Sequence, residues 1–287
     1  MYKFLSVLLI IVSTFVCVNT SFAKKWYVND AATTNDVFTT AVGSQVTQAV
    51  NLISGSTISG ALSVANFAKF DVGDYITGSG VPVGTYIVAK NATTLKLEFS
   101  ASATSTGSST LTIYGGRITK PVLSLKSLID INIVQENDTI YVDAGTYLNE
   151  SIIIKKNNLT VIGAGKSLTL FNSTTILTGP LFNDLGTYST CSTICNVISF
   201  NLSNVKIKGY KNAGAIVIKA NNTVDTTRVT INSCFFEDNY TALPNSVGGG
   251  AICATTTGGL SKPSVLTIQN SDFYNNKTKQ SNGHWCR

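Results

Sequence analysis

The sequence predicts an all-β fold in which short parallel strands wind into a coil, and three observations support this prediction. Residues 229–241 (VTINSCFFEDNYT) align without a gap on residues 266–278 (LTIQNSDFYNNKT), an offset of 37 positions, with GGGAI between them. From residue 137 onward, apolar residues alternate in short runs, and Asn, Gly, Asp and Ser separate the runs as corners. Such self-similarity is typical of stacked units that bury their apolar faces against one another.

The first 23 residues are typical of a secretory signal peptide. Lys3 precedes an apolar run over residues 4–18, and Ser21 and Ala23 supply the small residues of a cleavage site. A membrane anchor is the alternative, but the apolar run is short and lies close to that site. We therefore expect cleavage after Ala23, a secreted or outer-surface location, and no transmembrane segment in the mature chain.

Composition argues against nucleic acid as a partner. The formal net charge is +6, and it falls to +5 when Lys3 is removed with the signal peptide. The lysine pairs at 24–25 and 155–156 are isolated, whereas phosphate binding needs basic charge concentrated on one face. Only 13% of residues are charged and 44% are hydrophobic, which fits a secreted β protein with a continuous core.

Residues 44–119 have a different pattern, which predicts a small inserted β domain. Alternating apolar positions such as Tyr75, Leu97 and Ile113 indicate strands, and Gly and Pro mark the turns between them. After this segment, residues 120–133 space Leu125, Leu128 and Ile129 along one face of a short helix. We expect this helix to cap the open end of the coil, where unpaired strand edges would otherwise be exposed.

The strands of the coil are predicted from apolar pairs at alternating positions. These pairs are Ile140/Val142, Ile152/Ile154, Leu159/Val161, Leu168/Leu170, Val205/Ile207, Ile216/Ile218, Val229/Ile231 and Leu266/Ile268. One repeat unit is predicted to hold strands at 248–252, 265–270 and 272–276, with residues 255–264 as a loop. A sandwich of hairpins is the alternative, but it requires no fixed repeat, and the Asn-Gly turn signal is absent between the runs.

Equivalent residues in the two copies have predicted structural roles. Phe236 and Phe273 are expected to fill the core, and Gly248–Gly250 to let neighbouring turns approach closely. Asn239 and Asn276 are expected to form a hydrogen-bonded ladder at one corner, in preference to binding a ligand.

Five cysteines remain after signal cleavage, so at least one thiol stays unpaired within the chain. Cys191 and Cys195, in CSTIC, either form a disulfide that clips a surface loop or remain two thiols. Cys234 and Cys253 are expected to pack as small apolar side chains. His284 is the only histidine in the sequence, and no zinc site or cofactor site is predicted.

The GGAI, LTI-x-N and F-x-x-N elements resemble the repeats of right-handed parallel β-helix proteins on bacterial surfaces. Residues 137–171 are similar to the first turns of the pectin-lyase-like superfamily, and residues 26–43 resemble the mature N-terminus of large secreted β-helix proteins of the Bacteroidetes. The resemblance implies a right-handed parallel β-helix, with residues 24–43 as its N-terminal strand and cap and residues 120–287 as its body. It implies no particular activity, because the superfamily holds lyases, hydrolases, adhesins and stalks.

No catalytic residue set is recognised. Lyases of this superfamily use a basic residue beside acidic calcium ligands, and the hydrolases use neighbouring aspartates. The chain has no paired-aspartate turn, GHG tripeptide or R-x-P-x-x-R motif, and Arg117 and Arg228 are isolated. Asp71 and Asp74 are interpreted as turn residues rather than calcium ligands.

Glu237 and Asp238 are adjacent on a predicted strand. Neighbouring strand residues face opposite ways, and we therefore expect these carboxylates not to act together.

The leading functional hypothesis is a non-catalytic secreted or surface protein, adhesin-like or a stalk, whose loops 179–196 and 255–264 contact extracellular polysaccharides or partners. The alternative is a polysaccharide lyase or glycoside hydrolase whose site lies in missing turns. The ending HWCR breaks the repeat and predicts a truncated or frame-shifted fragment, so a product without function is a third hypothesis.

Overall fold

The computed structural model describes residues 23–32, 34–154, 156–175, 179–185, 197–211, 214–220, 226–241, 249–256 and 265–278. The predicted signal peptide, except for Ala23, lies outside these residues, as do the Cys191–Cys195 pair and the terminal HWCR.

Parallel sheets dominate the described part of the chain, in which strand is far more abundant than helix. The first sheet contains β1 (Lys25–Val28), β7 (Thr139–Val142), β10 (Leu159–Gly163), β13 (Val197–Ser203), β16 (Thr226–Asn232) and β20 (Val265–Gln269). The second contains β8 (Gly145–Leu148), β11 (Thr169–Asn172), β14 (Lys206–Lys208), β17 (Phe235–Glu237) and β21 (Asp272–Tyr274). The third contains β9 (Ile152–Ile153), β12 (Phe182–Leu185), β15 (Ile216–Ala220) and β19 (Ile252–Thr256).

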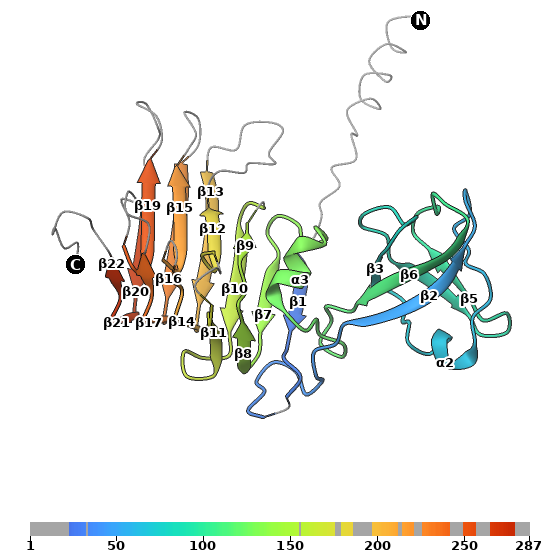
Figure 1. Ribbon diagram of the computed structural model, residues 1–287, viewed down its shortest axis with the longest axis horizontal. Helices are drawn as coiled ribbons and strands as arrows, with labels where there is room; N and C mark the ends of the chain where they lie inside the picture. The colour runs from blue at the N-terminus through green and yellow to red at the C-terminus, as the bar shows by residue number, and fades with distance from the viewer. Residues whose placement is uncertain are drawn as a thin grey trace, which may run out of the picture.

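The chain visits these three sheets in a fixed order and then returns to the first. Thus β7, β8 and β9 are followed by β10, β11 and β12, and each new strand pairs in parallel with its equivalent one round earlier. A short pair, β18 (Tyr240–Thr241) with β22 (Lys277–Thr278), extends the last rounds. Figure 1 shows the strands following one another along the long axis from green to red. Antiparallel hairpins are therefore excluded for this part of the described chain.

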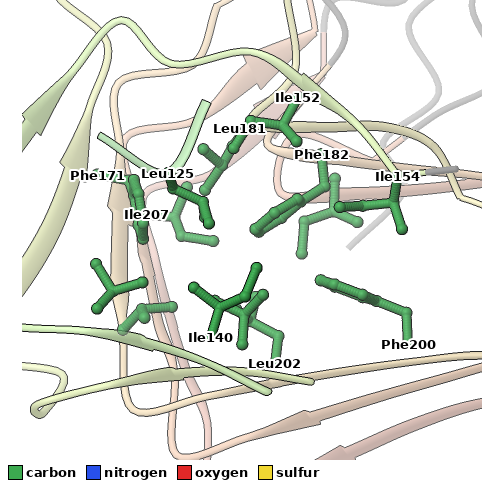
Figure 2. Close-up of a cluster of buried hydrophobic side chains, with 14 of the residues drawn as sticks. Leu125, Ile140, Ile152, Ile154, Phe171, Leu181, Phe182, Phe200, Leu202 and Ile207 are labelled. Carbon is green, nitrogen blue, oxygen red and sulfur yellow. The ribbon is translucent and has the colours of Figure 1, made fainter. Parts of the chain in front are cut away.

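The alternating apolar residues of the strands form columns in the interior. In the first sheet, Ile140, Val161, Leu202 and Ile231 are in register and are each at most 1% exposed. Figure 2 shows side chains from the different sheets pointing into one shared interior. Burial of these columns supplies the main stabilisation of the stack.

The corners between strands lie mainly at residues with positive φ. Asn149, Asn158 and Asn204 have φ values of 53°, 51° and 60°, and Asn270 has 51°. Asparagine tolerates this left-handed conformation better than most residues, because its short side chain can hydrogen-bond locally. The predicted corner chemistry is confirmed at these positions.

The structure corrects which residues of one predicted strand face the core. Leu168 and Leu170 were expected to face the core, but in β11 Thr169 and Phe171 are buried instead. Phe171 is in register with Tyr147 of β8, and the two rings lie 5.3 Å apart. The large aromatic ring therefore determines which side of the strand faces inward, since a one-residue shift exchanges the two faces.

Two predicted loops and one strand are also corrected. Residues 179–196 were predicted as a loop, but β12 lies within them, with Phe182 fully buried and paired with Ile152. The strand predicted at 248–252 begins only at Ile252, and it continues into the segment predicted as the loop 255–264. The preceding Gly250 permits close approach as predicted, because a Cβ there would lie 2.4 Å from the Lys277 carbonyl oxygen.

Phe236 is fully buried as predicted, but Phe273 is 47% exposed. The two rings stack at 4.9 Å with an interplanar angle of 4°. In the described chain β21 is the edge strand of the second sheet, so Phe236 covers one face of Phe273 while the other face stays accessible.

The short helix predicted within residues 120–133 is present as α3 (Leu125–Asp130). Ser124 caps its N-terminus by accepting a hydrogen bond from the Ser127 amide. Leu125 and Leu128 are fully buried in the same core as the strand columns, and Ile129 packs against them. The helix lies beside the β1 end of the stack in Figure 1.

Strands between residues 46 and 114 form an antiparallel lobe with its own core, drawn apart from the stack in Figure 1. Its strands are β2 (Val46–Leu52), β6 (Gly107–Tyr114) and β3 (Tyr75–Thr77), in that order, and a hairpin of β4 (Ile87–Asn91) and β5 (Lys96–Phe99). A one-turn helix, α2 (Val64–Phe67), buries Phe67 in this core and was not predicted.

Asp74 joins the antiparallel lobe to the segment that leads back to the stack. Its carboxylate is fully buried, pairs with Arg117 and Lys120, and accepts the Asp71 amide at 2.8 Å. The Lys120 ammonium lies 2.6 Å from Asp74 Oδ2. Arg117, isolated in the sequence, is thus paired in the structure. Asp74 also lies in a turn, as predicted, because its amide donates to the Asp71 carbonyl at 3.1 Å.

Candidate functional site

The acidic pair Glu237 and Asp238 does not behave as predicted. β17 ends at Glu237, and Asp238 has a φ of 53°, so the two residues are not alternating positions of one strand. Both carboxylates converge on the Lys208 ammonium, at 2.9 Å and 3.4 Å. Hydrogen bonds from Lys206 and Lys208 lower the pKa of Glu237. This cluster on the second sheet is therefore an internally neutralised set of ion pairs.

The predicted asparagine ladder is confirmed. Asn239 donates through Nδ2 to Asn276 Oδ1 at 2.9 Å and to the Ile207 carbonyl at 3.0 Å. Its own Oδ1 accepts the Tyr210 amide at 3.1 Å. These bonds satisfy backbone groups at the bend, and they leave Asn239 fully buried. Cys234 and Cys253 are also buried as predicted.

The outward side of the first sheet presents two straight rows of residues, which we call the outer face. The first row is Tyr27, Tyr141, Ile162, Ser203, Asn232 and Gln269, and the second is Lys25, Thr139, Thr160, Asn201, Thr230 and Thr267. All of these side chains are exposed or partly exposed. Parallel strands lie ~4.8 Å apart, so the second row offers a hydroxyl or amide group at that regular spacing from Thr139 onward, and the first row does so from Ser203 onward, after Ile162.

Aromatic rings form the β1 end of the outer face. Tyr27 and Tyr141 stack with centroids 5.4 Å apart, and Phe38 meets Tyr141 edge-on at 5.0 Å. Asp143 fixes the segment that carries Phe38, because its carboxylate accepts the amides of Val37, Phe38 and Thr39 at 2.6–2.9 Å. We call Tyr27, Phe38 and Tyr141 the aromatic platform. The buried Asp143 carboxylate holds Phe38 in place within it.

A cavity of about 660 Å³ lies on another side of the stack, next to α3. Asp30, Lys126, Thr146, Leu148 and Glu150 contribute to its wall. Gly145 lets Asp30 approach, since a Cβ there would lie 2.2 Å from Asp30 Oδ2. Asp30 then accepts the Thr146 amide at 3.2 Å, which fixes one carboxylate at the cavity.

Glu150 is the buried acid of this cavity. It is only 4% exposed, its Oε2 accepts the Lys126 amide at 3.2 Å, and its Oε1 has no hydrogen-bond partner. Burial raises the pKa of Glu150 to about 7, against the opposing effect of hydrogen bonds from the start of α3. A buried carboxyl with a raised pKa beside a cavity is typical of functional sites, although structural networks also produce it.

Sequence reasoning did not identify Glu150. Asn149 turns the chain after β8, and Glu150 then shares the inward alternation of Ile152 and Ile154, both of which are buried. An acidic residue in phase with buried isoleucines was the available signal.

In the part of the chain that the structure describes, no group of three or more His, Cys, Asp and Glu side chains is placed to hold a metal ion. Nor does any described helix have the length and apolar character needed to cross a membrane.

Comparison with known proteins gives no assignment: no family model, no curated protein and no solved structure matches this chain.

Proposed function

We propose that the chain is a non-catalytic secreted or cell-surface module, adhesin-like or a stalk, that binds extracellular polysaccharide along its outer face. The observation that carries the proposal is the pair of in-register rows: an aromatic platform lies at one end, and hydroxyl and amide side chains follow it, with Ile162 as the one apolar aliphatic residue in the rows. Aromatic rings present apolar faces on which sugar rings stack, and the polar groups can bond sugar hydroxyls.

The chemistry of the rows favours an uncharged polysaccharide. Lys25 is the one charged residue in the two described rows, and it lies at their end. On the second sheet, the positive charges of Lys206 and Lys208 balance the negative charges of Glu237 and Asp238. Recognition would therefore depend on stacking and hydrogen bonds more than on charge.

The proposed architecture is a right-handed parallel β-helix of the pectin-lyase-like kind, built from residues 24–43 and 120–287, with residues 44–119 as an inserted β domain. Support comes from the fixed sheet order and the continuous parallel register. Right-handedness is expected because crossover connections between parallel strands of one sheet are right-handed in nearly all proteins. α3 would close the first end of the coil.

Tyr141→Ala tests the polysaccharide site. We expect it to weaken binding of neutral oligosaccharides by roughly fivefold, because an aromatic contact of this kind is worth about 1 kcal/mol. Tyr274→Ala is the matched control, since Tyr274 is 62% exposed on the second sheet. Binding is measured by calorimetry on the ligands that a glycan array selects.

Two results would contradict the proposal. Equal losses in the Tyr141 and Tyr274 variants would remove the outer face as the site. Release of unsaturated or reducing ends from anionic or neutral polysaccharides by the wild-type protein would instead establish a lyase or hydrolase, the alternative function.

A further inference from the structure

We propose that the cavity beside Glu150 binds the protonated amine of a small polyhydroxylated molecule, such as an amino sugar. This cavity is built from α3, β8 and the Asp30 segment, and it uses none of the residues of the outer face. The proposal therefore does not depend on the polysaccharide site.

The first step is the unpartnered oxygen. Glu150 lines the cavity, and its Oε1 is buried without a hydrogen-bond partner, although buried carboxylate oxygens normally have one. The other oxygen, Oε2, is held by the Lys126 amide, which fixes the carboxyl group in place. A ligand that donates a hydrogen bond to Oε1 would satisfy this atom.

The second step is the charge around the cavity. Asp30 supplies a second carboxylate, which is fixed through the amides of Ala32 and Thr146. The ammonium of Lys126 pairs with Asp130 one helical turn further on, so its charge is already matched. The cavity wall is therefore acidic, and it favours a cation that can donate hydrogen bonds. The titratable groups facing Glu150 or its neighbours are Asp30, Asp36, Asp143, Tyr147, Tyr210 and Lys126.

The third step distinguishes an amine from a metal ion. In the described chain the acidic residues of the cavity do not form a group of three or more that could hold a metal. An alkylammonium needs fewer ligands, since it donates three hydrogen bonds from one point charge. Ser124 and Thr146 add hydroxyl groups to the wall, and Leu123 and Leu148 add apolar surface, which suits a polyhydroxylated carbon chain.

The probes for the test are 1-amino-1-deoxyglucitol and glucitol, which differ only by an amino group in place of a hydroxyl. The full chain is titrated with each by calorimetry at pH 8 and at pH 5. We expect the amine to bind at pH 8 and glucitol to bind at least about tenfold more weakly. The amine should also lose at least about tenfold in affinity at pH 5, where Glu150 is protonated while an alkylamine keeps its charge at both pH values.

Two further measurements locate the binding on Glu150. Glu150→Gln should remove both the preference for the amine and the pH dependence, whereas Glu98→Gln, at an exposed acid of β5, should change neither. Circular dichroism checks that each variant is folded. In the wild-type protein at pH 7, binding should release protons, because the amine favours ionised Glu150; calorimetry in two buffers of different ionisation enthalpy measures this release.

The outcomes that overturn the proposal are specific. They are equal affinity for the amine and glucitol, an unchanged affinity in the folded Glu150→Gln variant, no proton release, no detectable binding of the amine, or binding of Ca²⁺ that needs Glu150 without any binding of the amine. A failure of the Tyr141 experiment alone would leave this site unaffected.

Discussion

Replacing Asp74 by Asn is expected to lower the free energy of unfolding of the antiparallel lobe by about 3 kcal/mol, because removing one partner of a buried ion pair leaves unmatched charge. Asp74 is fully buried, and Lys120 and Arg117 are only 17% and 32% exposed at their side chains. Asn keeps the size of the group but cannot balance either cation. Urea unfolding followed by the fluorescence of Trp26 measures the change, since Trp26 lies 5.6 Å from Tyr75 of this lobe. A Trp285→Phe background removes the second tryptophan signal.

Asp71→Asn is the matched control for this experiment. Asp71 contacts the same two cations, at 3.7 Å from Arg117 and 3.1 Å from Lys120, but it is 54% exposed. Exposed ion pairs contribute at most about 1 kcal/mol. If both variants lose the same small amount of stability, the buried carboxylate does not hold the junction together.

Glu150 is expected to make the stability of the stack fall as the pH rises. Its pKa is about 7 in the folded chain, against 4.5 for the ordinary side chain. Between these values the folded state binds more protons than the unfolded state, so this contribution is complete below about pH 4.5 and is lost as the pH rises through about 7. The shift corresponds to a loss of about 3 kcal/mol across that interval.

Glu150→Gln should remove this pH dependence and should make the variant more stable than the wild type at pH 8. Urea unfolding of the stack at pH 5 and pH 8, in the absence of amines, gives both values. Glu98→Gln should keep the wild-type slope, because Glu98 is exposed on the hairpin of the other lobe. A wild-type slope in the folded Glu150→Gln variant would mean that another group causes the pH effect.

Much of the stack could be predicted from the sequence because its signals are local and repeated. Alternation marked the inward residues, asparagines marked the corners, and the 37-residue repeat correctly aligned Asn239 with Asn276. Errors arose where one large residue decided the packing. Phe171 reversed the inward side of β11, and Phe182 converted a predicted loop into a strand.

The two candidate sites could not be predicted because both depend on register between distant segments. Tyr27 and Tyr141 are 114 positions apart, and they meet only because β1 pairs with β7. Asp30 reaches the cavity beside Glu150 through Thr146, which lies 116 positions away. Similarly, Asp74 finds Arg117 and Lys120 across the antiparallel lobe. A linear pattern shows these residues as isolated.

The register of the first sheet is the central claim, and distances between spin labels measure it most directly. Labels at Thr139 are paired in turn with labels at Asn201, Thr230 and Thr267, which are attached by a chemistry that does not use cysteine. The parallel stack predicts distances that grow by about 5 Å with each added strand. Distances that do not rise in this order, or that are equal for Thr230 and Thr267, would contradict the stacked register and the outer face that depends on it.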